Sequence, residues 1–265
     1  FLSSFFFRSI VSYNIYDIDY GTSDYFNLYE STKNNLDLVS NYVETQLQKG
    51  FTHLFVMSTG WNNHQNASRI QYNEWVENLK LLAKSDGIDF KPFIIGLTWP
   101  SFWGKINMID VANKANDADE LGLTHINYLI WKGLLSKKII KSIPVIFIGH
   151  SFGARILTRA AYSKDYFVKS NTSKEIDLIF ALQGAYPVDR HLNEDGRFKS
   201  INLGLYTQTD SCKRIVGTMS KGDTAMNTAR FFGGGMYIGD DKSETKISNI
   251  DSNPFEFNQV DSDGI

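Results

Sequence analysis

The chain has 265 residues, of which 42% are apolar and 21% are charged, and this length suits one large domain better than two small ones. A formal net charge of −2 gives no broad electrostatic attraction to nucleic acid or to an anionic membrane, and no run of about 18 apolar residues predicts a membrane-spanning helix. The single cysteine, Cys212, excludes an intrachain disulfide and a zinc site built from cysteines.

The start of the chain leaves the cellular compartment open. The first residue is Phe1 rather than methionine, so we expect the natural start to lie upstream. Residues 1–11 are apolar but interrupted by Arg8, a pattern that fits either the remnant of a signal-peptide core or a first buried strand. A cytoplasmic and an exported protein are both compatible with the sequence, and nothing in it indicates an oligomeric state.

Short apolar runs alternate with amphipathic segments along the rest of the chain. No repeat, low-complexity stretch or proline-rich linker divides it, so we expect residues 1–265 to form a single domain. In chain order, the pattern predicts a helix over 33–48, a strand over 51–58, a helix over 68–84, a strand over 93–99, a helix over 112–135, a strand over 144–148, a helix over 154–162, and strands over 176–183, 214–219 and 255–260. This order is typical of an α/β protein, whose mostly parallel sheet has helices on both faces.

The motif GHSFG at 149–153 matches G-x-S-x-G and stands directly between a predicted strand and a predicted helix. In that context the serine sits on a strained turn that lifts its hydroxyl clear of the sheet, and the two glycines leave room for neighbouring backbone. The N-terminus of the following helix favours a developing negative charge. We therefore predict that Ser151 is a nucleophile; the alternative is an ordinary strand–turn–helix in which Ser151 caps the helix.

A second segment, STGWNN at 58–63, follows the first of the central predicted strands. Acyl transfer requires two backbone N–H groups aimed at the developing oxyanion, one from the residue after the nucleophile and one from the loop after an earlier strand. The sequence predicts Phe152 as the first donor and Trp61 as the second, because Gly60 permits a close backbone approach. The alternative is a plain polar turn at the two asparagines of the segment.

Four segments together resemble a known family: STGWNN at 58–63, GLTWPS at 96–101, NKANDADELG at 113–122 and IGHSFGAR at 148–155. Over roughly residues 50–230 the chain is similar to bacterial α/β-hydrolase-fold serine hydrolases of esterase or lipase type, whose substrates are poorly defined. The resemblance implies an α/β-hydrolase fold. The usual first motif of that family is HGWNN or HGFNN, and Ser58 and Thr59 stand here on its histidine side, a change in loop support and not in the triad.

The order of the catalytic triad in this fold, serine then acid then histidine, places the acid after a late strand. Asp223 follows the predicted strand at 214–219 in a turn that reads SKGD, and we predict that it holds a histidine in the correct tautomer. Asp223 also precedes the helical-looking segment TAMNTAR, so a helix N-cap is a second role that is compatible with the first. Asp189, after the predicted strand at 176–183, is the second choice for the acid.

No histidine follows Asp223, so the general base is missing from its usual place. The histidines of the chain all precede it: His53, His64, His125, His150 and His191. The simplest hypothesis is that the sequence ends just before the histidine loop, which in this fold follows the last strands. Without that base Ser151 would be a poor nucleophile. His191 is an alternative base, although its position breaks the usual order.

Two segments, residues 100–120 and 185–210, are predicted to form a cap over the site. From these segments we predict that Tyr186, His191 and Phe102 bind the substrate. An apolar pocket for the acyl group is expected to be lined by aromatic residues: Trp61, Trp99, Phe102, Trp103, Phe152 and Tyr186. The alternative for each aromatic ring is packing in the core.

The acidic run DADE at 117–120 is expected to be a solvated helix turn rather than a metal site, and the predicted reaction needs no cofactor or metal. The sequence thus predicts a serine hydrolase that cleaves a small-molecule acyl ester through an acyl-enzyme on Ser151. One alternative is a catalytically inactive protein of the same fold that binds a ligand or partner, which the lack of a late histidine favours. Another is a peptidase or acyltransferase, since the fold does not separate these activities.

Overall fold

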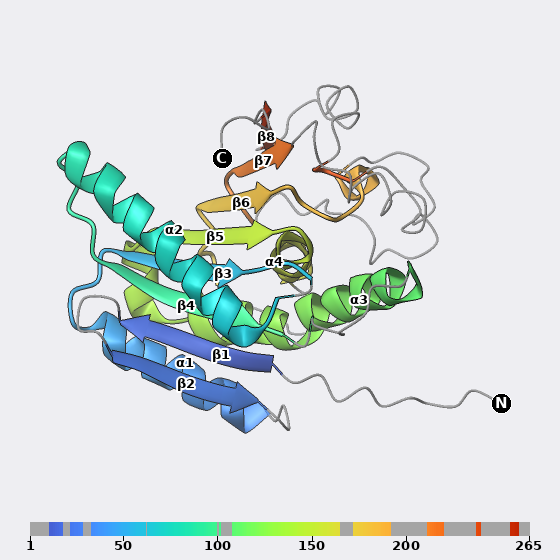
Figure 1. Cartoon of the computed structure of the whole chain (residues 1–265). Coiled ribbons are helices and arrows are strands. Elements are labelled where there is room, and N and C mark those ends of the chain that lie inside the picture. Colours follow the sequence, from blue (N-terminus) through green and yellow to red (C-terminus); the bar gives the residue numbers. More distant parts are fainter. Residues whose placement is uncertain are drawn as a thin grey trace.

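One mostly parallel sheet organises the part of the chain that the computed structural model describes (Figure 1). The described residues are 11–17, 22–28, 33–61, 63–99, 101, 108–164, 172–191, 211–219, 237–239 and 255–259. Within them an eight-stranded sheet has the order β2-β1-β4-β3-β5-β6-β7-β8. The strands are β1 (Val11–Asp17), β2 (Thr22–Leu28), β3 (His53–Ser58), β4 (Pro92–Thr98), β5 (Val145–His150), β6 (Leu178–Leu182), β7 (Ile215–Met219) and β8 (Phe255–Gln259).

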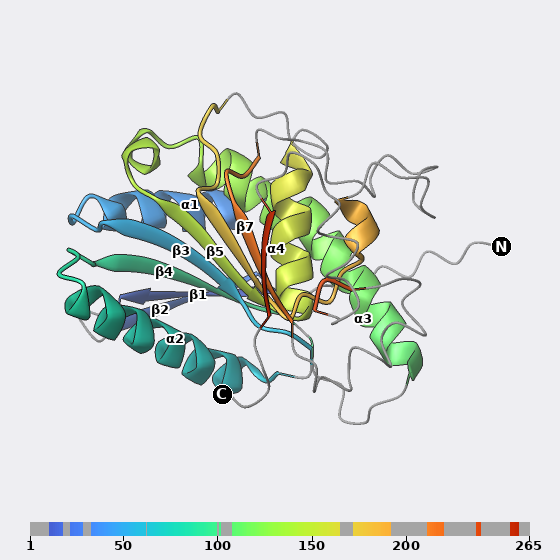
Figure 2. The same cartoon turned by 90° about the horizontal axis from the view of Figure 1, so that it is seen from above.

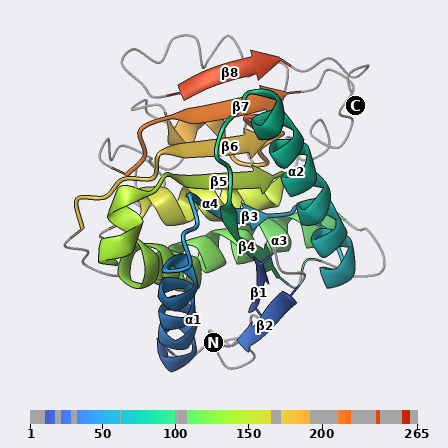
Figure 3. The ribbon, with the colours of Figure 1, turned by 90° about the vertical axis from the view of Figure 1, so that its left-hand side faces the viewer.

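Every pair of neighbouring strands from β4 to β8 is parallel, and each of the six predicted strands is confirmed within a few residues. The hairpin of β1 and β2 was not predicted. β1 pairs antiparallel with both β2 and β4, so the hairpin forms one edge of the sheet, opposite β8 (Figure 3). Of the segment 1–11, all but its last residue lies outside the described residues.

Helices cover both faces of the sheet, as expected for an α/β protein (Figure 2). α2 covers one face, and α1, α3 and α4 cover the other. The α-helices are α1 (Lys33–Leu47), α2 (Gln65–Ser85), α3 (Met108–Leu121) and α4 (Phe152–Tyr162). The π-helical segments are η1 (Gly122–Ile126) and η2 (Tyr128–Leu134), and the 3-10 segments are η3 (Lys138–Ser142) and η4 (Val188–Arg190).

Burial on both faces explains why the central strands read as continuous apolar runs. In β3, Leu54 and Val56 belong to the larger core cluster with α1 and α4, whereas Phe55 and Met57 belong to the smaller cluster with α2. Successive side chains of a strand point to opposite faces, so a strand with helices on both faces needs apolar residues at every position.

The segment predicted as one helix over 112–135 is helical, but its helix type changes along its length. α3 is continued by the wider π-helical turns of η1 and η2. The change begins at Gly122, where the segment crosses α4 so closely that a Cβ would stand 2.5 Å from the carbonyl oxygen of Ile156. Only glycine permits this approach of two helices.

The same segment also fastens the C-terminal end of α4. The Asn127 side chain donates a hydrogen bond from Nδ2 to the carbonyl of Ser163 at 2.6 Å. The Trp131 indole donates from Nε1 to the carbonyl of Ala160 at 2.8 Å. The last carbonyls of a helix have no partner within it, so these buried side chains satisfy groups that would otherwise be costly to bury.

Candidate active site

Ser151 occupies the turn between β5 and α4, on the side where the parallel strands end (Figure 1). Its backbone has φ +53° and ψ −121°, and among the described residues only Gln183 also combines a side chain with a positive φ. Such a conformation costs about 1–2 kcal/mol, so its surroundings must enforce it. The N–H of Ser151 donates to the carbonyl of Leu182 at 3.0 Å, and its own carbonyl accepts from Ala154 and Ala185, both at 3.1 Å.

The hydroxyl of Ser151 does not serve the helix that it precedes. Ser151 is the N-cap residue of α4, yet its side chain makes no capping hydrogen bond. An ordinary capping serine accepts a hydrogen bond from an N–H group in the first turn. The side chain is therefore not used in the structural role considered as the alternative for this residue.

Both glycines of the GHSFG motif lie where a side chain has no room. A Cβ at Gly149 would stand 2.5 Å from the backbone nitrogen of Ala154. A Cβ at Gly153 would stand 2.5 Å from the carbonyl carbon of Ser58, at the end of β3. The first glycine lets α4 turn back over β5, and the second lets α4 begin against the neighbouring strand.

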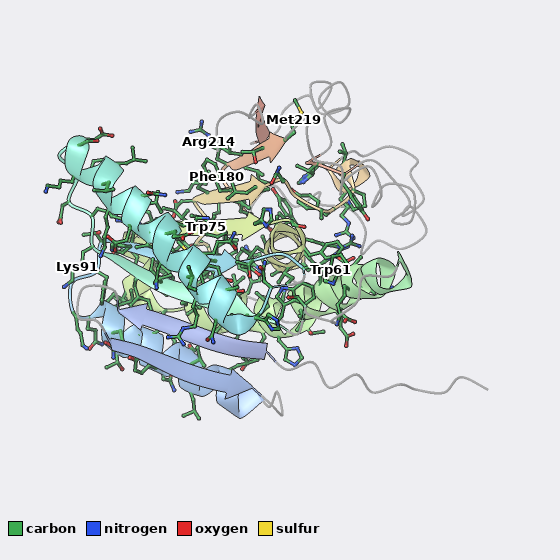
Figure 4. All side chains as sticks on the ribbon, viewed as in Figure 1. Trp61, Trp75, Lys91, Phe180, Arg214 and Met219 are labelled. Atoms are coloured by element: carbon green, nitrogen blue, oxygen red, sulfur yellow. The ribbon has the colours of Figure 1, made fainter. Side chains whose placement is uncertain are left out.

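The loop after β3 lies directly against Ser151. A Cβ at Gly60 would stand 2.7 Å from Cβ and 3.2 Å from Oγ of Ser151. Trp61, labelled in Figure 4, follows and is half-buried against the larger core cluster. Its indole Nε1 is buried without a hydrogen-bond partner among the described residues. Two segments that are far apart in the sequence thus meet at the Ser151 hydroxyl.

Phe152 places the start of α4 at the same point. It is the first residue of the helix, and its ring is buried in the core. The N–H groups of a first helical turn have no partner within the helix and carry partial positive charge. The N-terminus of α4 therefore favours negative charge beside Ser151.

A buried charge cluster connects α3, α4 and η4 behind this turn. Arg190 donates two hydrogen bonds to the carboxylate of Asp119, at 2.8 and 2.6 Å. Arg155 and Arg159 of α4 contact the same carboxylate at 2.6 and 3.3 Å. Arg155 also donates to the carbonyl of Ala185 at 3.4 Å, and the N–H of that residue holds the Ser151 carbonyl.

The expectation that Asp119 belongs to a solvated acidic turn is wrong. Burial raises the pKa of its carboxyl, but the charges of Arg190, Arg155 and Arg159 outweigh that effect and hold the pKa well below the ordinary value. Asp119 is therefore ionised at neutral pH. The error arose because the partners of Asp119 come from distant parts of the chain.

Tyr186 and His191, which were predicted to bind substrate, are both buried. Their ring centroids lie 5.7 Å apart, and the ring of His191 also stands 5.7 Å from that of Tyr162. Burial, assisted by the charge of Arg190, lowers the pKa of His191 to about 3, so the imidazole is neutral at pH 7. Both side chains take part in core packing, and their contact with substrate stays a prediction.

The remaining predicted site residues cannot be compared with the structure. Asp223 and Phe102 lie outside the described residues, and so does the side chain of Asp189. Of the two predicted cap segments, residues 108–120 belong to α3, and residues 192–210 lie outside the described part.

Gln183 is a feature of the site that no sequence motif indicated. It follows β6 with φ +45°, and its N–H donates to the carbonyl and the hydroxyl of Thr218, both at 3.1 Å. Gly239 packs against it so closely that a Cβ there would stand 2.7 Å from the carbonyl carbon of Gln183. A positive φ at glutamine has no signature in composition or spacing, so only the fold reveals it.

Within the described residues, no group of three or more histidine, cysteine, aspartate or glutamate side chains is placed to hold a metal ion. No helix of that part of the chain is long and apolar enough to cross a membrane.

No protein-family model and no curated protein sequence matches the chain. Several solved structures are similar to it at low identity. Three of them are a protein from Thermus thermophilus (9% identity over 80% of this chain and 81% of that one, TM-score 0.43), the poly(3-hydroxybutyrate) depolymerase LpqC from Bordetella parapertussis (13% over 80% and 74%, TM-score 0.41) and brefeldin A esterase, a bacterial homologue of human hormone sensitive lipase (10% over 96% and 68%, TM-score 0.36).

In the α/β-hydrolase fold, a strained strand-to-helix turn stands at the top of a central parallel strand, and the loop after an earlier strand faces it. Both relations hold in this protein: β5 lies between β3 and β6, and the loop after β3 touches Ser151 through Gly60. The predicted fold class is thereby confirmed, and the chain has the α/β-hydrolase fold.

Proposed function

We propose that the protein is a serine hydrolase that cleaves an ester-like bond of a small acyl ester through an acyl-enzyme on Ser151. One observation carries the proposal. The Ser151 side chain stands on a strained turn, without a capping hydrogen bond, between the N-terminus of α4 and the glycine of a neighbouring loop. Strained backbone of this kind is maintained where the geometry serves a function.

The chemistry follows from these positions. Oγ of Ser151 attacks the ester carbonyl carbon while a general base takes its proton, and the carbonyl oxygen becomes an oxyanion. The backbone N–H groups of Phe152 and Trp61 would donate to that oxygen. Collapse of the tetrahedral intermediate expels the alcohol, which takes the proton from the base. Water then repeats the sequence on the acyl-enzyme, releases the carboxylic acid and restores the serine.

In this reaction Ser151 is the nucleophile and Phe152 and Trp61 are the oxyanion donors, whereas no residue of the sequence is assigned as the general base. Asp223 is proposed to orient a histidine and to stabilise its protonated form. Every histidine of the sequence precedes Asp223. His191 is a poor candidate for that role, because its ring packs between Tyr186 and Tyr162 in the core.

A covalent probe tests the nucleophile directly. The protein is treated with a fluorophosphonate and with p-nitrophenyl acetate, and the labelled peptide is identified by mass spectrometry. We expect one label on Ser151, and we expect Ser151→Ala to lose the label and at least about 10³-fold in ester hydrolysis. Ser136→Ala is the matched control, because Ser136 is an exposed serine in the turn after η2, outside the site, and its hydroxyl donates to the carbonyl of Lys132.

Labelling of both serine variants to the same extent would reject the nucleophile. Absence of labelling in the wild-type protein would favour the alternative of an inactive α/β-hydrolase-like protein that binds a ligand.

A further inference from the structure

The loop that faces Ser151 is held by side chains from outside it. The backbone N–H of Thr59 donates to the hydroxyl of Tyr72 at 2.9 Å. The carbonyl of Thr59 accepts a hydrogen bond from the indole Nε1 of Trp99 at 3.1 Å. All three residues are buried, so both backbone groups of Thr59 depend on these two partners rather than on water.

The Tyr72 hydroxyl links β3 to β4 just beyond the last backbone pair of these two strands. The parallel ladder between β3 and β4 ends at the pair Ser58 and Leu97. Tyr72, from α2, donates its own hydroxyl hydrogen to the carbonyl of Leu97 at 2.6 Å while it accepts from Thr59. The hydroxyl therefore bridges the two strands at the point where their backbones diverge.

The far end of the loop is held in a similar way. The hydroxyl of Ser101, after β4, donates to the carbonyl of Asn63 at 3.0 Å and accepts from the N–H of the same residue at 3.3 Å. Gly60 and Trp61 thus lie between two residues whose backbones are bonded to side chains of other elements.

The contact from Trp99 has a direct consequence for the amide hydrogens of the loop. A peptide unit is planar and trans, so its carbonyl and its N–H point in opposite directions. The Trp99 indole holds the carbonyl of Thr59, and the N–H of Gly60 belongs to the same peptide plane. The orientation of that plane also sets where the next peptide, which carries the N–H of Trp61, begins.

We propose that Tyr72 and Trp99 are positioning residues of the site: they hold the loop at Thr59 so that its amide hydrogens face Ser151 before a substrate binds. The inference rests on the proposed function. Donors that are oriented in advance stabilise an oxyanion without reorganisation during the reaction, which is where most of their catalytic value lies. Neither side chain has to touch the substrate for this effect.

Conservative variants test the inference, because each removes one hydrogen-bonding group and keeps an aromatic ring. Trp99→Phe removes the indole N–H, and Tyr72→Phe removes the hydroxyl. Trp131→Phe is the matched control for the first, since Trp131 is a buried indole that also donates to one backbone carbonyl. Tyr128→Phe is the control for the second, since its hydroxyl donates to Asp37.

The measurement separates binding from reaction. Fluorophosphonate labelling at several probe concentrations gives an apparent Ki and a limiting rate, and p-nitrophenyl acetate gives KM and kcat. We expect Trp99→Phe to lower the limiting rate and kcat by about 10- to 100-fold with Ki and KM within twofold of wild type. Tyr72→Phe should show the same pattern with a smaller loss. Both control variants should keep the wild-type rates, although we expect their denaturation midpoints to fall about as far as those of Trp99→Phe and Tyr72→Phe.

The outcomes distinguish the positioning role of Tyr72 and Trp99 from the proposed hydrolase function. Wild-type rates in Trp99→Phe and Tyr72→Phe, with Ser151 still labelled, would overturn the positioning role and leave the proposed function standing. Equal losses in the control variants would also overturn it, because they would make the effect one of stability alone. Should Trp99→Phe not fold, Tyr72→Phe and its control decide the question. A wild-type protein that is never labelled would overturn the proposed function itself.

Discussion

The substitution Gly153→Ala tests how closely α4 and β3 must approach for the site to form. The added Cβ would stand 2.5 Å from the carbonyl carbon of Ser58, whereas ordinary contacts begin at 3.4 Å. The carbonyl oxygen of Ser58 would stand closer still, so the two backbones must separate by more than about 0.9 Å. The Ser58 carbonyl belongs to the main chain and the backbone fixes the position of a Cβ, so no side-chain rotation relieves the clash. Overpacking of this kind costs about 1–3 kcal/mol of unfolding free energy, and more where the backbone is rigid.

The required movement changes the site itself. Ser58 pairs with Leu97 on one side and with Gly149 on the other, so the end of β3 is fixed between two strands. A displacement of α4 instead moves the N–H of Phe152 away from the loop at Gly60. A misplacement of about 1 Å can cost about 10²-fold in rate, and we expect that loss in the rate of fluorophosphonate labelling.

A second glycine supplies the control. Gly87, after α2, has φ +68° with open space around it, so Gly87→Ala costs about 1–2 kcal/mol through backbone strain alone. Both variants are compared by denaturant unfolding and by labelling rate. The reasoning fails if Gly153→Ala keeps the wild-type labelling rate, or if Gly87→Ala loses as much labelling at equal loss of stability.

Two further predictions concern buried charge. Asp119→Asn leaves Arg155, Arg159 and Arg190 without their shared carboxylate and should cost about 3–5 kcal/mol in denaturant unfolding at pH 7. The folded pKa of Asp119 lies below its unfolded value, so the difference from wild type should shrink as the pH falls below about 4, and a constant difference would contradict the role of the charge. His191 has a folded pKa of about 3, below its unfolded value of 6.5, so folding is favoured above pH 6.5 and loses stability as the pH falls toward 3. Between pH 7 and pH 5 the wild type should lose about 2 kcal/mol more than His191→Gln, as measured by the same method.

The sequence predicted those parts of the fold whose signal is local. The central strands were found because burial on both faces makes them continuous apolar runs, as in FIIGLT of β4. The edge hairpin was missed because its strands, VSYNIYD and TSDYFNL, mix polar and apolar residues and contain Asn and Asp, which strands disfavour. The turn at Ser151 was found because its glycines, its serine and its flanking elements occupy twelve consecutive residues, 144–155.

The parts of the site that were missed depend on contacts between distant residues. Asp119 reads as one acid of an exposed run, and only the fold brings it to Arg190, 71 positions further along the chain. Tyr72 and Trp99 carry no local signal of a positioning role, because their polar atoms acquire one only where the fold brings them to Thr59. The positive φ of Gln183 arises from the packing of Gly239 and the contact with Thr218, neither of which leaves a trace in the local sequence.

The bonds between the Ser151 turn and the sheet bear on how the protein can adapt to substrates of different size. The N–H of Ser151 donates to the carbonyl of Leu182 in β6, and its carbonyl accepts from the N–H of Ala185 just beyond that strand. Ser151 can therefore shift only as far as the end of β6 shifts. Accommodation of a longer or bulkier acyl group must then come from the segments around this turn, so breadth of substrate choice and accuracy of attack are properties of different parts of the chain.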